Sequence, residues 1–174
     1  VAFVTGNAFR RAMAEEQSHS ILLARVIEDQ ATRTLDSGEM ALDALGMSPV
    51  LRAAVPDAAA MQAVLSQTLS GLSFLRTIAV VDAHGNLLAS TNSAEAGIRI
   101  DLESLGTQSI NGRGVLGPLV RGRGLAAIQV GAPAVEAPPG LAFIPLMRPM
   151  VDEAGRPLLL LGLINPDAFS NFQY

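Results

Sequence analysis

The strongest constraint on the fold is a short segment near the carboxyl end, residues 157–164 (PLLLLGLI), in which almost every side chain is apolar. A strand with apolar residues on both faces belongs in the middle of a sheet. The segment has about eight residues, whereas a membrane-spanning helix needs about 20. It follows a β-prone segment, residues 141–151, and a tight-turn sequence, residues 152–155. The pair predicts an antiparallel hairpin that contains a central strand.

A second hairpin is predicted in the middle of the chain. Residues 77–82 (TIAVVD) and 87–91 (LLAST) are β-prone. The four residues between them, 83–86 (AHGN), have the composition of a tight turn. The chain is therefore expected to contain two hairpins of similar design.

A long amphipathic helix is expected at the amino end. Residues 8–46 contain no proline, and apolar side chains recur every four positions, at Leu23, Ile27, Ala31 and Leu35. Residues 36–39 (DSGE) have the spacing of a capping box, so they either start a further helix or form a mild fault in one continuous helix. The sequence leaves both alternatives open.

Shorter helices are expected between and after these segments. Pro56 and Asp57 have the character of a helix start, and apolar residues then repeat at helical spacing to about residue 71. Asp101 is placed to cap a short helix over residues 102–109, because its carboxylate can accept hydrogen bonds from the first backbone amides. Asn165 precedes a terminal helix.

The order of these elements predicts an α+β fold in one domain, residues 1–174, with a long N-terminal helix packed on an antiparallel sheet of about five strands. The expected parts are the long helix (1–46), the second helix (57–71), the sheet region (77–164) and the start of an exit helix (167–174).

The composition argues against several classes of function. Twelve basic and sixteen acidic residues give a net charge of −4, which is unfavourable for binding nucleic acid. Cysteine is absent, so disulfides, thiolate metal sites and cysteine nucleophiles are excluded. His19 and His84 are far apart and are predicted to be surface residues rather than metal ligands. We therefore expect no enzymatic activity, no cofactor and no metal.

One charge pattern suggests a binding site. No aspartate or glutamate occurs between residues 104 and 135, yet Arg113, Arg121 and Arg123 lie there among glycines. Glycine allows a ligand to approach the backbone, and guanidinium groups bind carboxylates or phosphates. Arg148 is a fourth candidate, because it alternates with Met147 along a predicted strand. The segment is thus either the wall of an anion pocket or a basic loop without a ligand.

Three stretches of sequence together resemble the Cache-type sensor domains, PAS-like folds found outside the membrane in bacterial receptors. The stretches are LRTIAVVDAHGNLLAST, AEAG and FIPLMRPMVDEAGRPLLLLGLINPDAFSNF. Asp82 with Gly85 and Asp152 with Gly155 match the D-x-x-G turns of the two family hairpins, where we expect them to build turns rather than to bind a ligand. The chain departs from the family in having no tryptophan, so the amino-acid-binding signature is missing.

The resemblance implies a ligand-sensing module in the periplasmic or extracellular part of a bacterial inner-membrane protein. The anchoring segments would lie outside this sequence, and the cytoplasmic output would be a histidine kinase or, next, a diguanylate cyclase or chemoreceptor. A small molecule, such as a carboxylate or other anion, would bind between the sheet and the glycine-rich segment and shift the terminal helices. The long helix is also a candidate for pairing with its copy in a homodimer.

Two other classes of function remain open. A protein-binding or dimerisation module would use the proline-rich loop around residues 133–139, or the long helix, and would have no enclosed pocket. A hydrolase or lyase would need Asp, His or Ser side chains that meet only in the folded chain.

Overall fold

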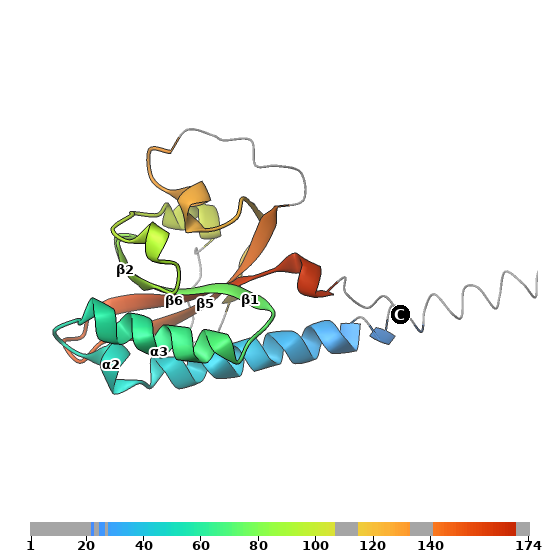
Figure 1. Cartoon of the computed structure of the whole chain (residues 1–174), viewed down its shortest axis with the longest axis horizontal. Coiled ribbons are helices and arrows are strands. Elements are labelled where there is room, and N and C mark those ends of the chain that lie inside the picture. The colour runs from blue at the N-terminus through green and yellow to red at the C-terminus, as the bar shows by residue number, and fades with distance from the viewer. Residues whose placement is uncertain (1–21, 23–24, 27, 107–114, 133–140, 170–174) are drawn as a thin grey trace, which may run out of the picture. The chain divides into compact units, whose positions relative to one another are not determined.

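The computed structural model describes residues 22, 25–26, 28–106, 115–132 and 141–169 (Figure 1). The chain divides into two compact units, Val1–Leu35 and Asp36–Tyr174. Residues 28–46 are helical without a break at Asp36, so residues 36–39 do not begin a new helix. No helix in the described part of the chain combines the length and apolar character that crossing a membrane requires.

An antiparallel sheet forms the centre of the second unit. Its strands are β1 (Leu75–Asp82), β2 (Leu87–Ser90), β3 (Val115–Leu116), β4 (Val120–Arg121), β5 (Ala142–Val151) and β6 (Pro157–Ile164). The order is β2-β1-β6-β5-β3, and β4 also pairs with β5. The apolar segment is β6, which lies between β1 and β5 and is buried from Leu158 to Ile164. The prediction of two hairpins and a central strand is therefore confirmed, and two short strands in the glycine-rich region raise the number from about five to six.

Helices cover one face of this sheet (Figure 1). They are residues 36–46 of the long helix, α2 (Pro49–Arg52) and α3 (Ala58–Ser70). Asp57 caps α3 by accepting hydrogen bonds from the amides of Ala59 and Ala60, at 3.1 and 3.3 Å. The long helix approaches the sheet closely at Gly38, where a Cβ would lie 2.9 Å from Cδ2 of Leu146. Leu42 and Leu45 are also buried, so residues 36–46 of the helix pack against β5 and β6.

A second layer covers the other face. It contains three 3₁₀ turns, η1 (Ser93–Glu95), η2 (Leu102–Leu105) and η3 (Leu125–Ile128), which Figure 1 shows above the sheet. The buried residues of this face form one apolar cluster: Ala79, Val81, Leu87, Ile100, Leu105, Leu125, Ile128, Phe143, Met147, Leu159, Leu161 and Leu163. The described part of the glycine-rich region is thus packed into the fold, since Val115 and Val120 lie against this cluster.

Two predicted elements differ from the structure, and one short helix was not predicted. The helix after Asp101 ends at Leu105, because Gly106 adopts a left-handed conformation (φ 69°) and stops it before residue 109. Helix α2 was not expected from the sequence. The exit segment begins as a 3₁₀ turn, η4 (Pro166–Phe169), rather than as an α-helix, and residues 170–174 lie outside the described residues. His19, Arg113 and the loop at residues 133–139 also lie outside them.

Candidate functional site

The predicted arginine residues do not form one cluster. Arg121 lies on β4 and Arg123 follows it in the glycine-rich segment, and both residues are exposed. Arg148 lies on β5 next to the long helix, where its guanidinium forms an ion pair with Asp43. Arg121 pairs with Ala142, six residues along β5 from Arg148, which corresponds to about 20 Å at the rise of a strand. Arg148 therefore belongs to a different region from Arg121 and Arg123.

Arg148 is packed under Gly46 of the long helix. A Cβ at residue 46 would lie 3.1 Å from Nε of Arg148. This Nε is buried and has no hydrogen-bond partner among the described residues. Met147, the preceding residue, belongs to the apolar cluster on the other face. The role of Arg148 in the described structure is therefore to join β5 to the helix.

A buried carboxylate holds the layer that carries Arg121 and Arg123. Glu95 is 3% exposed, and its Oε1 accepts a hydrogen bond of 2.9 Å from the backbone amide of Leu125. Its Oε2 accepts a bond of 3.3 Å from the hydroxyl of Ser90. Leu125 is the first residue of η3, and its preceding residue, Gly124, has no side chain to cap the turn. Glu95 thus caps η3 from 30 residues away, which no local sequence pattern reveals.

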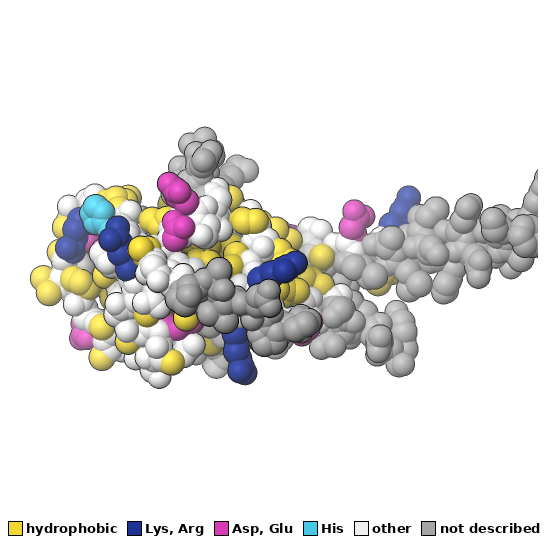
Figure 2. Space-filling model, turned by 90° about the horizontal axis from the view of Figure 1, so that it is seen from above, with side chains coloured by type: hydrophobic (Ala, Val, Ile, Leu, Met, Phe, Trp, Pro, Cys, Tyr) yellow, Lys and Arg dark blue, Asp and Glu magenta, His cyan; other side chains and the backbone are white. Residues whose placement is uncertain are grey.

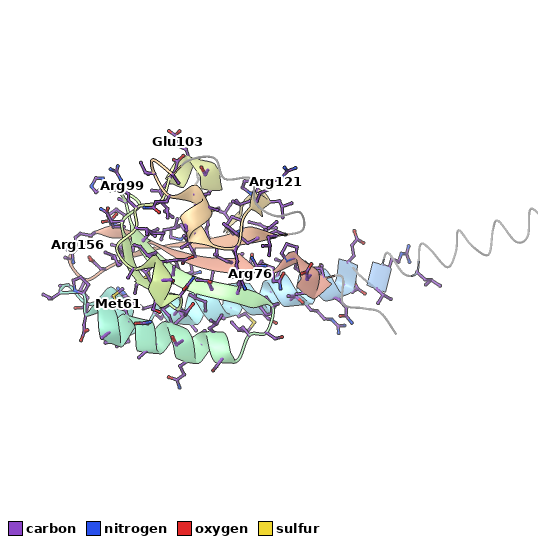
Figure 3. All side chains as sticks on the ribbon, turned by 45° about the horizontal axis from the view of Figure 1, so that its top comes forward. Met61, Arg76, Arg99, Glu103, Arg121 and Arg156 are labelled. Atoms are coloured by element: carbon purple, nitrogen blue, oxygen red, sulfur yellow. The ribbon has the colours of Figure 1, made fainter. Side chains whose placement is uncertain are left out.

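Arg76 connects the glycine-rich segment to the exit segment (Figure 3). Its Nη1 donates to the carbonyl oxygens of Arg123 and Ala142, at 3.0 and 3.2 Å. Its Nη2 donates to Oδ1 of Asn165 at 3.2 Å. The same Oδ1 accepts from the amide of Asp167 at the start of η4, 3.1 Å away. A single side chain therefore contacts both the candidate ligand segment and the beginning of the terminal segment.

A cavity of about 210 Å³ lies at the opposite end of the sheet, where both hairpin turns meet the start of α3. Its lining comes from α2, α3, β2, β6 and the two turns: Leu51, Ala53, Pro56, Met61, Asp82, Ala83, His84, Leu88, Asp152, Arg156, Pro157 and Leu158. The inner part is apolar, since Leu51, Met61 and Leu158 are buried. Charged groups lie with the turns, so the cavity has an apolar interior and a polar rim.

Each turn is organised by its own aspartate. Oδ1 of Asp82 accepts from the amides of His84 and Asn86, and Oδ2 accepts from the side-chain amide of Asn86. Burial raises the pKa of Asp82, but these hydrogen bonds and the charge of His84 outweigh burial and leave the pKa below its ordinary value. The turn-building interpretation of the D-x-x-G motif is confirmed for Asp82.

Asp152 has the same arrangement and adds an ion pair. Its Oδ1 accepts from the amides of Ala154 and Arg156, and its Oδ2 accepts from Nε of Arg156 at 2.8 Å. Burial again raises the pKa, but the bonds and charge of Arg156 outweigh it and hold the pKa of Asp152 below its ordinary value. Nη2 of Arg156 also donates to the carbonyl oxygen of Ala54. The four-residue spacing of Asp152 and Arg156 is the sequence signal that would have identified this pair.

The described residues hold no arrangement typical of a metal centre or an acid–base pair. No group of three or more His, Asp or Glu side chains within the described ranges is placed to bind a metal. His84 contacts the carboxylate of Asp82 through its backbone amide, which does not orient the imidazole as a general base.

Two solved structures share this fold. The extracellular domain of the candidate histidine kinase rpHK1S-Z16 superposes with a TM-score of 0.66 and 16% identity, over 92% of this chain and 62% of that one. An extracellular ligand binding receptor from Desulfohalobium retbaense DSM5692 gives a TM-score of 0.51 and 18% identity, over 80% of this chain and 25% of that one. This chain has their fold. The predicted α+β fold with a central antiparallel sheet is therefore confirmed, although no protein-family model and no curated protein sequence matches the chain.

Proposed function

We propose that this chain is the extracytoplasmic ligand-sensing domain of a membrane-bound signalling protein and is itself not catalytic. The observation that carries the proposal is the fold, which it shares over 92% of its length with the extracellular domain of a candidate histidine kinase. A histidine kinase is accordingly the output we favour, before a diguanylate cyclase or a chemoreceptor. The anchoring segments would lie outside residues 1–174.

The proposed ligand is a small anion, such as a carboxylate, that binds at the glycine-rich segment. Arg121 and Arg123 are the candidate ligands, since neither guanidinium has a hydrogen bond or ion pair to a described residue. Arg113 is the third candidate by sequence, whereas Arg148 is engaged with Asp43. A ligand shifts a conformational equilibrium only when it binds two states with different affinity. Movement of the segment at Arg123 would reach the terminal segment through Arg76.

A thermal-shift screen of organic acids, amino acids and phosphates tests this function. A ligand at 100 times its dissociation constant stabilises the folded state by about 2.7 kcal/mol. The double variant Arg121→Ala/Arg123→Ala should abolish the shift from any anionic hit. Arg25→Ala/Arg52→Ala is a charge-matched control in two exposed positions elsewhere and should preserve it. A thermal shift that survives the first variant would exclude the arginine site. If no small molecule causes a shift and the chain binds only proteins, the protein-binding module is favoured.

We also propose that the long helix pairs with a second copy of the chain. Met40 on this helix and Met47 in the turn directly after it are 72% and 75% exposed, so both offer apolar surface to a partner. Sedimentation of the wild type and of Met40→Glu/Met47→Glu tests this pairing. A monomeric wild type across micromolar concentrations would contradict it.

A further inference from the structure

The cavity at the turn end of the sheet has the character of a second binding site. We propose that it binds a small monocarboxylate with an apolar body of about one ring, separately from the arginines of the glycine-rich segment. All of its lining residues lie between Leu51 and Leu158, within the described part of the second unit. Neither Arg121 nor Arg123 is among them.

The size of the cavity limits the ligand. An apolar cavity of about 150 Å³ accommodates one benzene molecule. The volume here, about 210 Å³, leaves space for a ring and one short polar substituent. Leu51, Met61 and Leu158 line the cavity from α2, α3 and β6, so an apolar body placed there would contact side chains of three elements. Transfer of such a body from water to this interior is favourable.

The hydrogen-bonding capacity of the rim determines the charge of the polar substituent. The two carboxylates are already used by their own turns, since Asp82 accepts three hydrogen bonds and Asp152 accepts three. Their lowered pKa values mean that both are ionised at neutral pH and remain acceptors only. A ligand therefore finds few free acceptors at this rim.

Donors, by contrast, remain available. The side chain of Arg156 is 54% exposed, and its bonds to Asp152 and Ala54 use Nε and one N–H of Nη2, which leaves three N–H groups of the guanidinium. His84 is exposed beside it, and Arg99 lies next to His84 because its Nε donates to the carbonyl oxygen of that residue at 3.1 Å. Figure 2 shows the histidine, and Figure 3 the labelled Arg99 and Arg156, at this end of the molecule. Free cationic donors beside occupied carboxylates favour a carboxylate substituent over an ammonium group.

The position of the rim also indicates what a bound carboxylate would connect. Arg156 already joins the turn after β5 to Ala54 in the segment between α2 and α3. The amide of Glu153 donates to the carbonyl oxygen of Arg52 at 2.7 Å, which fixes the same turn to the end of α2. A ligand held by Arg156 and His84 would therefore also link the turn between β1 and β2 to the turn after β5 and to the end of α2.

Titration of the isotopically labelled chain with three compounds of similar size tests the proposal. The probes are benzoate, benzamide and benzylamine, and the readout is the amide resonances of the two turns. Benzoate at millimolar concentration should shift the resonances of His84, Ala154 and Arg156. Benzamide should bind about tenfold more weakly, which corresponds to one hydrogen bond to a charged group, and benzylamine more weakly still. Equal binding of benzoate and benzamide, or no shift at the turns, would overturn the proposal.

Four variants separate this site from the proposed sensory site. Arg156→Ala should weaken benzoate binding about tenfold or more, and Ala83→Trp should block benzoate and benzamide alike by filling the rim. Ala126→Trp is the matched control, because Ala126 is an exposed alanine outside the cavity lining. Arg121→Ala/Arg123→Ala should leave benzoate binding unchanged. If that double variant removes it while Ala83→Trp does not, benzoate occupies the glycine-rich segment and the cavity proposal is wrong.

Discussion

Removal of the Glu95 carboxylate should destabilise the whole layer that carries the candidate arginines. In Glu95→Ala, the buried amide of Leu125 loses its acceptor, and the hydroxyl of Ser90 loses its partner. A hydrogen bond to a charged group contributes about 1.5–3 kcal/mol, and only the bond to Leu125 is short. We therefore expect the free energy of unfolding to fall by about 2–3 kcal/mol. For a chain of this length the melting temperature should fall by about 4–12 °C.

Chemical denaturation of three variants measures this effect. Glu95→Gln retains an acceptor for the amide of Leu125 and should lose less stability than Glu95→Ala. Glu103→Ala removes an exposed glutamate from η2 and should change the free energy of unfolding by no more than about 0.5 kcal/mol. If Glu95→Ala and Glu103→Ala unfold at the same denaturant concentration, the capping role of Glu95 is refuted.

A double-mutant cycle with Gly124 provides an independent check. A Cβ at residue 124 would overlap Oε1 of Glu95, so Gly124→Ala should displace the carboxylate from the amide of Leu125. In the Glu95→Ala background this overlap no longer exists. The cost of Gly124→Ala should then decrease, with a coupling energy of about 1 kcal/mol or more. Equal costs in the two backgrounds would show that Gly124 does not act through Glu95.

Three further predictions concern the ionic and polar links of the fold. Because the pKa of Asp152 is lowered, the stabilisation from its carboxylate is present above pH about 3.9 and is lost as the pH falls through the folded-state pKa. Denaturation at several pH values should therefore show a smaller loss of unfolding free energy in acid for Asp152→Asn than for the wild type. Asp29→Asn, at an exposed position, should lose as much as the wild type. Arg148→Met should maintain or raise the free energy of unfolding, because it removes a buried Nε that has no partner among the described residues. Arg148→Ala should lower the free energy of unfolding by about 1–3 kcal/mol. A large loss of stability in Arg148→Met would contradict this account. Because Arg76 is bonded to both segments, Arg76→Ala should increase amide hydrogen exchange in residues 121–125 and in residues 165–169. A change in only one of the two segments would show that Arg76 does not couple them.

Elements with a local physical cause were predicted well. The apolar residues of β6 specify a strand covered on both faces, and this follows from eight adjacent residues. The turns at Asp82 and Asp152 depend on hydrogen bonds to amides two and four residues away. Asp57 likewise caps the helix that immediately follows it. Such patterns lie within a few residues of sequence and are therefore visible before folding.

The sequence by itself therefore determined the two hairpins, the central strand, the amphipathic helix and the absence of thiol chemistry. Only the tertiary structure decided that Glu95 caps η3, that Arg76 joins two distant segments, and that Arg148 packs beside the helix away from Arg121. It also decided that two separate turns enclose one cavity. The physical reason is that these contacts join residues up to 105 positions apart, and their partners are selected by the packing of whole layers rather than by local hydrogen bonds or periodicity.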